Sequence, residues 1–88
     1  MKKSDKMAKI NNSFVRVLAV YEILLSANKP LSASQIVMKL EQDYNINAER
    51  KAIYGYVRAI NMIFPIEYIK NQGYISIYIK ERNGGNYK

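Results

Sequence analysis

A chain of 88 residues forms one small domain, close to the lower size at which a single core is stable without disulfide or metal support. It contains no cysteine and no histidine, which excludes a disulfide framework and every common zinc site, and no metal or other cofactor is expected. Fourteen Lys and Arg residues against seven Asp and Glu give a net charge of +7, which favours polyanionic partners such as nucleic acid or an anionic membrane.

Residues 1–11 are polar and basic, and they predict a flexible tail or a basic arm that contacts DNA phosphates. The lysines of this segment are followed by an apolar stretch from Phe14 to Leu25, an order that also occurs in signal peptides. Arg16 and Glu22 interrupt the stretch, however. It is also shorter than the roughly 18 apolar residues that a membrane span needs. We therefore expect a cytoplasmic protein without a membrane segment. Its wealth of Ile, Asn, Lys and Tyr suggests an AT-rich genome, as in a low-GC bacterium, a phage or a virus.

The first predicted helix runs from Asn12 or Ser13 to about Ala27. One stripe at helical spacing is expected to pack, and it consists of Phe14, Val17, Leu18, Tyr21, Leu24, Leu25 and Asn28. Three further apolar residues lie off this stripe: Val15, Val20 and Ile23. Because so small a domain buries one broad face, these three are expected to form a homodimer contact, with exposure or cover by the same chain as the alternatives.

A second helix is predicted to start at a capping box. Pro30 ends the first helix, and Leu31 lies in a short extended segment. Ser32 then has the position of an N-cap and Gln35 that of its partner three residues later. The core face of this helix is expected to contain Ile36, Val37, Leu40 and Tyr44. Turn residues at 43–45 end it only a few residues before the next helix, which predicts a helix-turn-helix.

The third predicted helix spans Asn47 to Met62, with Asn47 as its N-cap. At about 100° per residue, one apolar line contains Ile53, Val57 and Ile60. The opposite arc contains Lys51, Tyr54, Gly55, Arg58 and Asn61. A glycine on the outward arc costs about 1 kcal/mol relative to alanine, so its place suggests the close approach of a partner or simply a tolerated surface position.

Strand patterns follow Pro65. Residues 66–70 and 74–79 are β-branched and aromatic and flank Asn71-Gln72-Gly73, which predicts a hairpin with Ile75, Ile77 and Ile79 on its core face. Residues 81–88 are expected to be a second flexible tail. The order of elements predicts an α+β winged helix-turn-helix domain over residues 12–80, with three helices and a C-terminal hairpin as the wing.

These residues also resemble the helix-turn-helix domain of bacterial DeoR-like and WYL-domain transcriptional regulators. The likeness covers residues 14–79 and is carried by three segments: Leu31-Ser32-Ala33 with the Ile36 helix, Lys51-Ala52-Ile53-Tyr54 through Val57 and Ile60, and Pro65-Ile66-Glu67-Tyr68 with Gly73-Tyr74. Gly55-Tyr56 stands where the family usually has Arg-Asp, and the family's effector-sensing domain is absent. The resemblance implies a stand-alone DNA-binding transcriptional regulator. We expect it to act most simply as a repressor, and the apolar excess of the first helix predicts a homodimer.

The expected partner is therefore double-stranded DNA, with the third helix in the major groove and the hairpin beside it. The expected contact residues are Arg50, Lys51, Tyr54, Gly55, Arg58 and Asn61 on the helix, with Lys70 and Asn71 at the hairpin tip. The alternative is a protein-binding winged helix, such as a small phage protein that inhibits a host nuclease, with exposed tyrosines as anchors. An enzyme is not expected, because the chain lacks His, Cys, paired carboxylates and a phosphate-binding loop.

Overall fold

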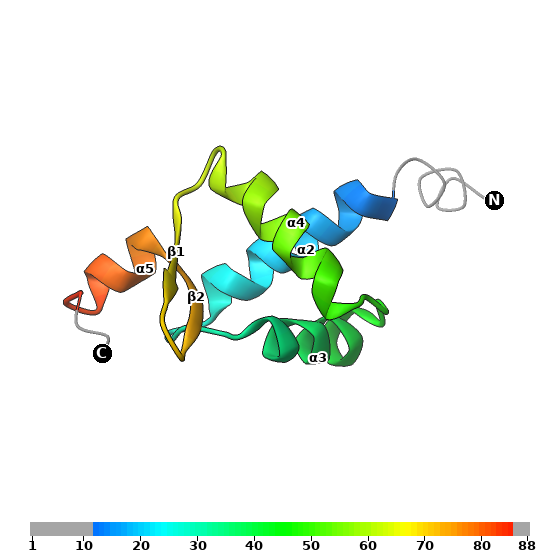
Figure 1. The fold of residues 1–88 in the computed structure, drawn as a ribbon, viewed down its shortest axis with the longest axis horizontal. Helices are drawn as coiled ribbons and strands as arrows, with labels where there is room; N and C mark the ends of the chain where they lie inside the picture. The colour runs from blue at the N-terminus through cyan, green and yellow to red at the C-terminus, as the bar shows by residue number, and fades with distance from the viewer. Residues whose placement is uncertain (1–11, 86–88) are drawn as a thin grey trace.

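The computed structural model describes residues 12–85 of the chain. Three helices precede a two-stranded antiparallel hairpin and a short helix, in the order α2 (Asn12–Ser26), α3 (Ala33–Tyr44), α4 (Arg50–Asn61), β1 (Ile66–Ile69), β2 (Gly73–Ser76) and α5 (Ile77–Arg82) (Figure 1). This confirms the predicted α+β class and is compatible with a winged helix. The tail predicted for residues 1–11 lies outside the described residues. No helix among those described is long and apolar enough to cross a membrane.

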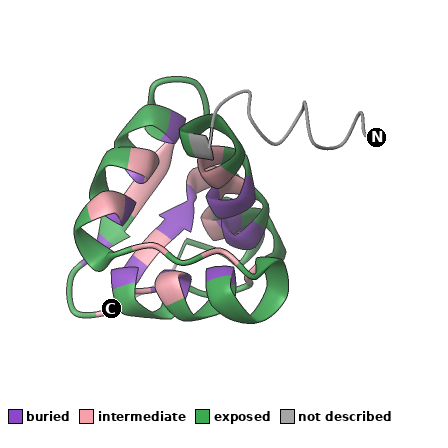
Figure 2. Cartoon of the chain, turned by 90° about the vertical axis from the view of Figure 1, so that its right-hand side faces the viewer, coloured by how far each residue is buried: buried purple, intermediate pink, exposed green. Residues whose placement is uncertain are grey.

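The main core lies where α2, α3 and α4 meet. Figure 2 shows buried segments on the sides of the helices that face one another. The buried members come from the three helices and from the segment before α3: Ala19, Val20, Ile23, Leu24, Leu31, Ala33, Ile36, Leu40, Ile53, Val57 and Ile60. Each fully buried Leu or Ile side chain stabilises the fold by about 1.5 to 3 kcal/mol, so these few residues supply most of the stabilisation available to a chain of this size.

The core face of α2 matches the predicted stripe only in part: Leu24 is buried, and Val17 and Tyr21 pack partly against the core. Val20 and Ile23 are 0% and 3% exposed and lie in the core, whereas Phe14 and Leu18 are exposed. The prediction that Val20 and Ile23 form a homodimer contact is therefore wrong, because side chains buried by α3 and α4 offer no surface to a second chain. Val15, the third residue of that prediction, is exposed. Since α2 is apolar around most of its circumference, periodicity alone did not select the packed face.

The predicted capping box of α3 is confirmed. The Ser32 hydroxyl accepts the Gln35 N–H at 3.1 Å, and the Gln35 side chain accepts the Ser32 N–H at 2.8 Å. At the other end, Asn45 has a left-handed φ of 55° and closes the helix through its N–H to the Glu41 carbonyl. The following Ile46 packs partly against the core.

A side-chain link also joins α3 to α2. The Tyr44 hydroxyl and the Ser26 hydroxyl both donate to the Glu22 carboxylate. The bond to Glu22 raises the pKa of Tyr44 to about 12, and the bonds from Tyr44 and Ser26 lower the pKa of Glu22 below its usual value. Tyr44 is thus held on the surface by a charged hydrogen bond, although the sequence pattern placed it on the core face of its helix.

The hairpin is attached to the helices by the segment between α2 and α3. β1 pairs with β2 so that Tyr68 lies opposite Tyr74 and Ile69 opposite Gly73. On the other edge of β2, Leu31 forms an antiparallel bridge with Tyr74. The Leu31 N–H donates to the Tyr74 carbonyl at 2.9 Å, and the Tyr74 N–H donates to the Leu31 carbonyl at 2.7 Å. The extended segment predicted around Leu31 therefore acts as a third, very short strand.

The second strand is shorter than the sequence predicted. It ends at Ser76, and α5 begins at Ile77 instead of the strand continuing to Ile79. Ile79 of α5 is nevertheless buried, in a small cluster with Ile75 of β2 and Ile69 of β1. The alternating isoleucines suited a strand equally well, so their pattern did not distinguish the two conformations.

Two side-chain contacts, one within α5 and one just after it, hold this helix against the rest of the domain. Lys80 forms an ion pair with Glu67 of β1 at 2.8 Å, and the Asn83 amide donates to the Asn28 carbonyl at 2.7 Å. Figure 1 shows α5 on the side of the hairpin away from α2, α3 and α4. The tail predicted to begin at residue 81 thus begins with the last turn of a helix, because α5 includes Glu81 and Arg82.

Gly73 is required by the close approach of β2 to Leu31. Its φ is +131°, and a Cβ at this position would lie 2.2 Å from the Leu31 carbonyl carbon. We expect Gly73→Ala to lower the free energy of unfolding by about 2 kcal/mol or more, because it adds both backbone strain and a clash with main-chain atoms. Urea unfolding followed by circular dichroism measures the change.

Gly84→Ala is the matched control for this substitution. Gly84 also has a positive φ, but a Cβ there meets nothing within 4 Å. It therefore reports backbone strain alone, and a smaller loss of stability is expected. Equal losses in the two variants would contradict a tight contact between Gly73 and Leu31.

Candidate nucleic-acid interface

Helix α4 starts later than its sequence predicted. The helix begins at Arg50 with Glu49 as the N-cap residue, and no side chain caps it. The predicted N-cap, Asn47, instead offers its backbone carbonyl to the Arg16 guanidinium at 2.7 Å. The prediction of Asn47 as the cap is therefore wrong. Ala48 packs partly against the core, so the chain stays extended until it has passed this contact.

The two faces of α4 are divided as the helical spacing predicted. Ile53, Val57 and Ile60 are buried against the other helices. Lys51 and Arg58 lie on the exposed side of the same helix. Helix α4, the second helix of the helix-turn-helix order, thus presents cationic side chains to solvent. In helix-turn-helix proteins the second helix is the one that reaches the major groove.

Among the residues that the structure describes, the exposed cations near this face have no carboxylate counter-charge. Within residues 12–85, Arg50, Lys51, Arg58 and Lys70 form no ion pair with a carboxylate, unlike Lys80. The same described part contains no group of acidic side chains that could hold a metal ion. Cations that are not neutralised internally remain available to phosphate groups of a partner.

A tyrosine-lined groove separates α4 from the hairpin. Its half near the hairpin turn is bordered by Arg50, Tyr54, Tyr68, Asn71 and Tyr74. Its other half is bordered by Tyr54, Arg58, Asn61, Tyr68 and Tyr74. The rings of Tyr68 and Tyr74 lie 5.2 Å apart at an interplanar angle of 59°. The structure thus brings residues of the predicted helix face and of the hairpin tip to the margins of one groove.

The chemistry of this groove is amphipathic. Burial raises the pKa of the Tyr74 phenol, and the neighbouring Tyr54 and Tyr68 add to the shift. The Tyr74 hydroxyl is therefore neutral at physiological pH and able to donate a hydrogen bond. Flat apolar rings with hydroxyl donors, flanked by Arg50 and Arg58, suit contact with the sugar and phosphate groups of a nucleic acid or with a protein surface.

Asn61 has a structural contact that the sequence did not indicate. Its side-chain carbonyl accepts the Ile66 N–H at 2.7 Å and so fixes the path of the chain from α4 into β1. Bidentate recognition of adenine requires both the carbonyl and the amide group of an asparagine. This bond occupies one lone pair of the Asn61 carbonyl and fixes its orientation, so the side chain is not free to turn toward a base.

The hairpin tip has the predicted form. Asn71 adopts a φ of 68°, and the Gln72 N–H donates to the Ile69 carbonyl at 2.9 Å across the turn. Lys70 and Asn71 are both exposed there. Tyr68 was missing from the predicted site, although the pairing of residues equidistant from Asn71 identifies it as the cross-strand neighbour of Tyr74.

In comparisons with known proteins, the chain matches no protein-family model, no curated protein and no solved structure. The likeness to DeoR-like and WYL-domain regulators therefore stays a hypothesis drawn from the sequence. The groove, the exposed cations and the helix-turn-helix arrangement are the features on which a function is proposed.

Gly55 is not required by the fold. It lies on the exposed side of α4, and a Cβ at this position meets nothing within 4 Å. We expect Gly55→Ala to raise the free energy of unfolding by about 1 kcal/mol, because alanine loses less conformational entropy in a helix interior. Thermal and urea unfolding of the free protein provide the measurement.

The reverse substitution in the same helix, Ala59→Gly, serves as the control. Ala59 is exposed in α4, and its replacement is expected to lower stability by a similar amount, about 1 kcal/mol. A loss of stability in Gly55→Ala would show that the open space beside Gly55 is needed by the folded chain itself.

Proposed function

We propose that this protein binds double-stranded DNA and acts as a transcriptional regulator, most simply a repressor. In this proposal α4 enters the major groove, and the β1–β2 hairpin lies against the adjacent backbone or minor groove. The observation that carries the proposal is the pair Lys51 and Arg58, which are exposed on the outward face of α4 and have no carboxylate partner within residues 12–85. Arg50 and Lys70 extend this positive surface on either side of the tyrosine groove.

The side chains on this surface suit distinct contacts with a duplex. Arg58 is able to pair with guanine through two parallel hydrogen bonds, a contact worth about 1 to 3 kcal/mol of discrimination against a wrong base. Lys51 and Lys70 suit phosphates, which fix position without reading sequence. Gly55, between Lys51 and Arg58, leaves room for the duplex to approach the helix backbone.

A protein-binding function is the second candidate, and the tyrosine groove is the observation that favours it. Tyr54 and Tyr68 are both exposed at its margin. Aromatic residues with a polar tip are common anchors of protein interfaces. Such an interface depends weakly on ionic strength, whereas binding to phosphates weakens steeply with added salt, so the two candidates are separated by a salt series.

The DNA proposal predicts a measurable loss in the double variant Lys51→Ala/Arg58→Ala. The probe is a labelled duplex from the region upstream of the protein's own gene, compared with a scrambled duplex of the same composition. We expect affinity for the upstream duplex to fall about 30-fold or more, because two contacts of about 1 kcal/mol or more each are lost. The slope of log affinity against log salt should become shallower by about 0.9, because Lys51 is the phosphate contact of the pair and Arg58 the base contact.

The control is Lys39→Ala/Arg82→Ala, which removes the same charge from exposed positions on α3 and α5. Both variants have the same net charge, so non-specific attraction to DNA falls equally in the two. A selective loss in the α4 variant is expected. The proposal would be contradicted if the protein bound both duplexes weakly and neither pair of substitutions changed this binding selectively. A protein partner would then be the better candidate.

A further inference from the structure

A second exposed surface of the domain is apolar. It combines the outer side of α2 with the segment that follows α4, and we call it the apolar ridge. Its members are Phe14, Leu18, Leu25, Met62, Ile63 and Phe64. Met62 and Ile63 are 83% and 74% exposed, which is unusual for large aliphatic side chains on a folded domain.

Four residues of α2 place the ridge along one line of the helix. Phe14, Leu18, Tyr21 and Leu25 are separated by steps of four, three and four, the spacing by which two helices pack side by side. This line lies on the side of α2 away from Val20, which is buried in the core. No charged residue stands on the line itself.

The segment after α4 is fixed against this line. The ring of Phe64 stacks on that of Tyr21, with centroids 4.5 Å apart and an interplanar angle of 24°. The Ile63 and Phe64 N–H groups both donate to the Ile60 carbonyl, at 2.9 and 2.8 Å. Met62, Ile63 and Phe64 are therefore ordered by the fold while their side chains remain in contact with solvent.

The area of the ridge is close to what a stable dimer buries. Large apolar side chains of this kind expose roughly 150 to 250 Å² each when fully accessible, so the six exposed fractions amount to about 500 to 850 Å² per chain. A standard specific interface buries about 800 Å² on each partner. Scattered exposed side chains do not reach this size within one continuous surface.

We propose that two copies of this chain associate through their apolar ridges about a two-fold axis. In such an arrangement the same surface meets itself, so the α2 line of one copy packs beside that of the other. A second copy fits because the line carries no charge, and the unpaired cations Arg50, Lys51 and Arg58 belong to α4. The contact replaces the one predicted from Val15, Val20 and Ile23, two of which are in the core.

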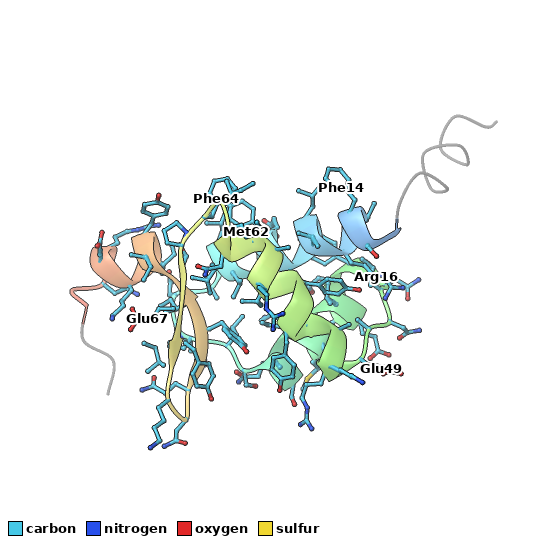
Figure 3. All side chains as sticks on the ribbon, turned by 45° about the horizontal axis from the view of Figure 1, so that its top comes forward. Phe14, Arg16, Glu49, Met62, Phe64 and Glu67 are labelled. Carbon is cyan, nitrogen blue, oxygen red and sulfur yellow. The ribbon has the colours of Figure 1, made fainter. Side chains whose placement is uncertain are left out.

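The ridge leaves the tyrosine groove open. In Figure 3, Phe14, Met62 and Phe64 lie along the upper edge of the molecule, and the hairpin turn lies at the lower edge. Two copies joined at the upper edge would each present the start of α4 and the hairpin turn on the far side. The association itself does not depend on whether the protein binds DNA.

Sedimentation equilibrium of the full chain without DNA tests the proposal. At loading concentrations from about 1 to 100 µM, we expect the mass to approach twice the chain mass of 10.2 kDa. Leu18→Glu should weaken the association at least about 100-fold, because it places a charge in the middle of the contact. Met62→Glu, at a highly exposed position after α4, should weaken it as well.

Met38→Glu is the matched control, since Met38 on α3 is 52% exposed and Leu18 on α2 is 51% exposed. It should leave the dimer intact, and circular dichroism should show that all three variants fold. A monomeric wild type at 100 µM would overturn the proposal. So would a dimer that survives both Leu18→Glu and Met62→Glu, or one that Met38→Glu disrupts equally.

Discussion

The two backbone hydrogen bonds between Leu31 and Tyr74 determine how the hairpin is joined to the helices. They require β2 to approach the segment before α3 closely, and only a residue without a Cβ fits at Gly73 beside this contact. At the other end of the hairpin, the bond from the Ile66 N–H to the Asn61 side chain holds the start of β1 to the end of α4. The tyrosine groove and its basic margins therefore depend on these two attachments, of which the Leu31 bridge is far from α4 in the sequence.

The surface of the domain is divided by chemistry. Basic side chains without carboxylate partners flank the tyrosine groove, whereas the apolar ridge runs along α2 and the segment after α4. The basic side chains favour polyanionic partners, and the apolar ridge favours a contact that excludes water. Because the two sets occupy different edges, a small domain is able to offer separate surfaces to a nucleic acid and to a second copy of itself.

Features that depend on neighbouring residues were predicted well from the sequence. The capping box at Ser32 and Gln35, the hairpin turn at Asn71 and the core line of Ile53, Val57 and Ile60 all have the predicted form. Each is governed by contacts within one turn or one helical face, so local spacing contains the necessary information. The candidate groove was predicted in part, since its helix residues were named but Tyr68 was not.

Local periodicity and charge were sufficient to predict the order of the three helices and the hairpin, and the exposed basic face of α4, but not α5. Only the tertiary structure decided which side of α2 is buried, since this helix has apolar residues around most of its circumference. It also decided that β2 ends at Ser76, after which Ile79 of α5 is buried with Ile75, and that Asn61 binds the Ile66 backbone. The burial of one side of α2 depends on packing against α3 and α4, which are distant in the sequence. The other two outcomes depend on contacts between successive elements, which compete with local preference and here override it.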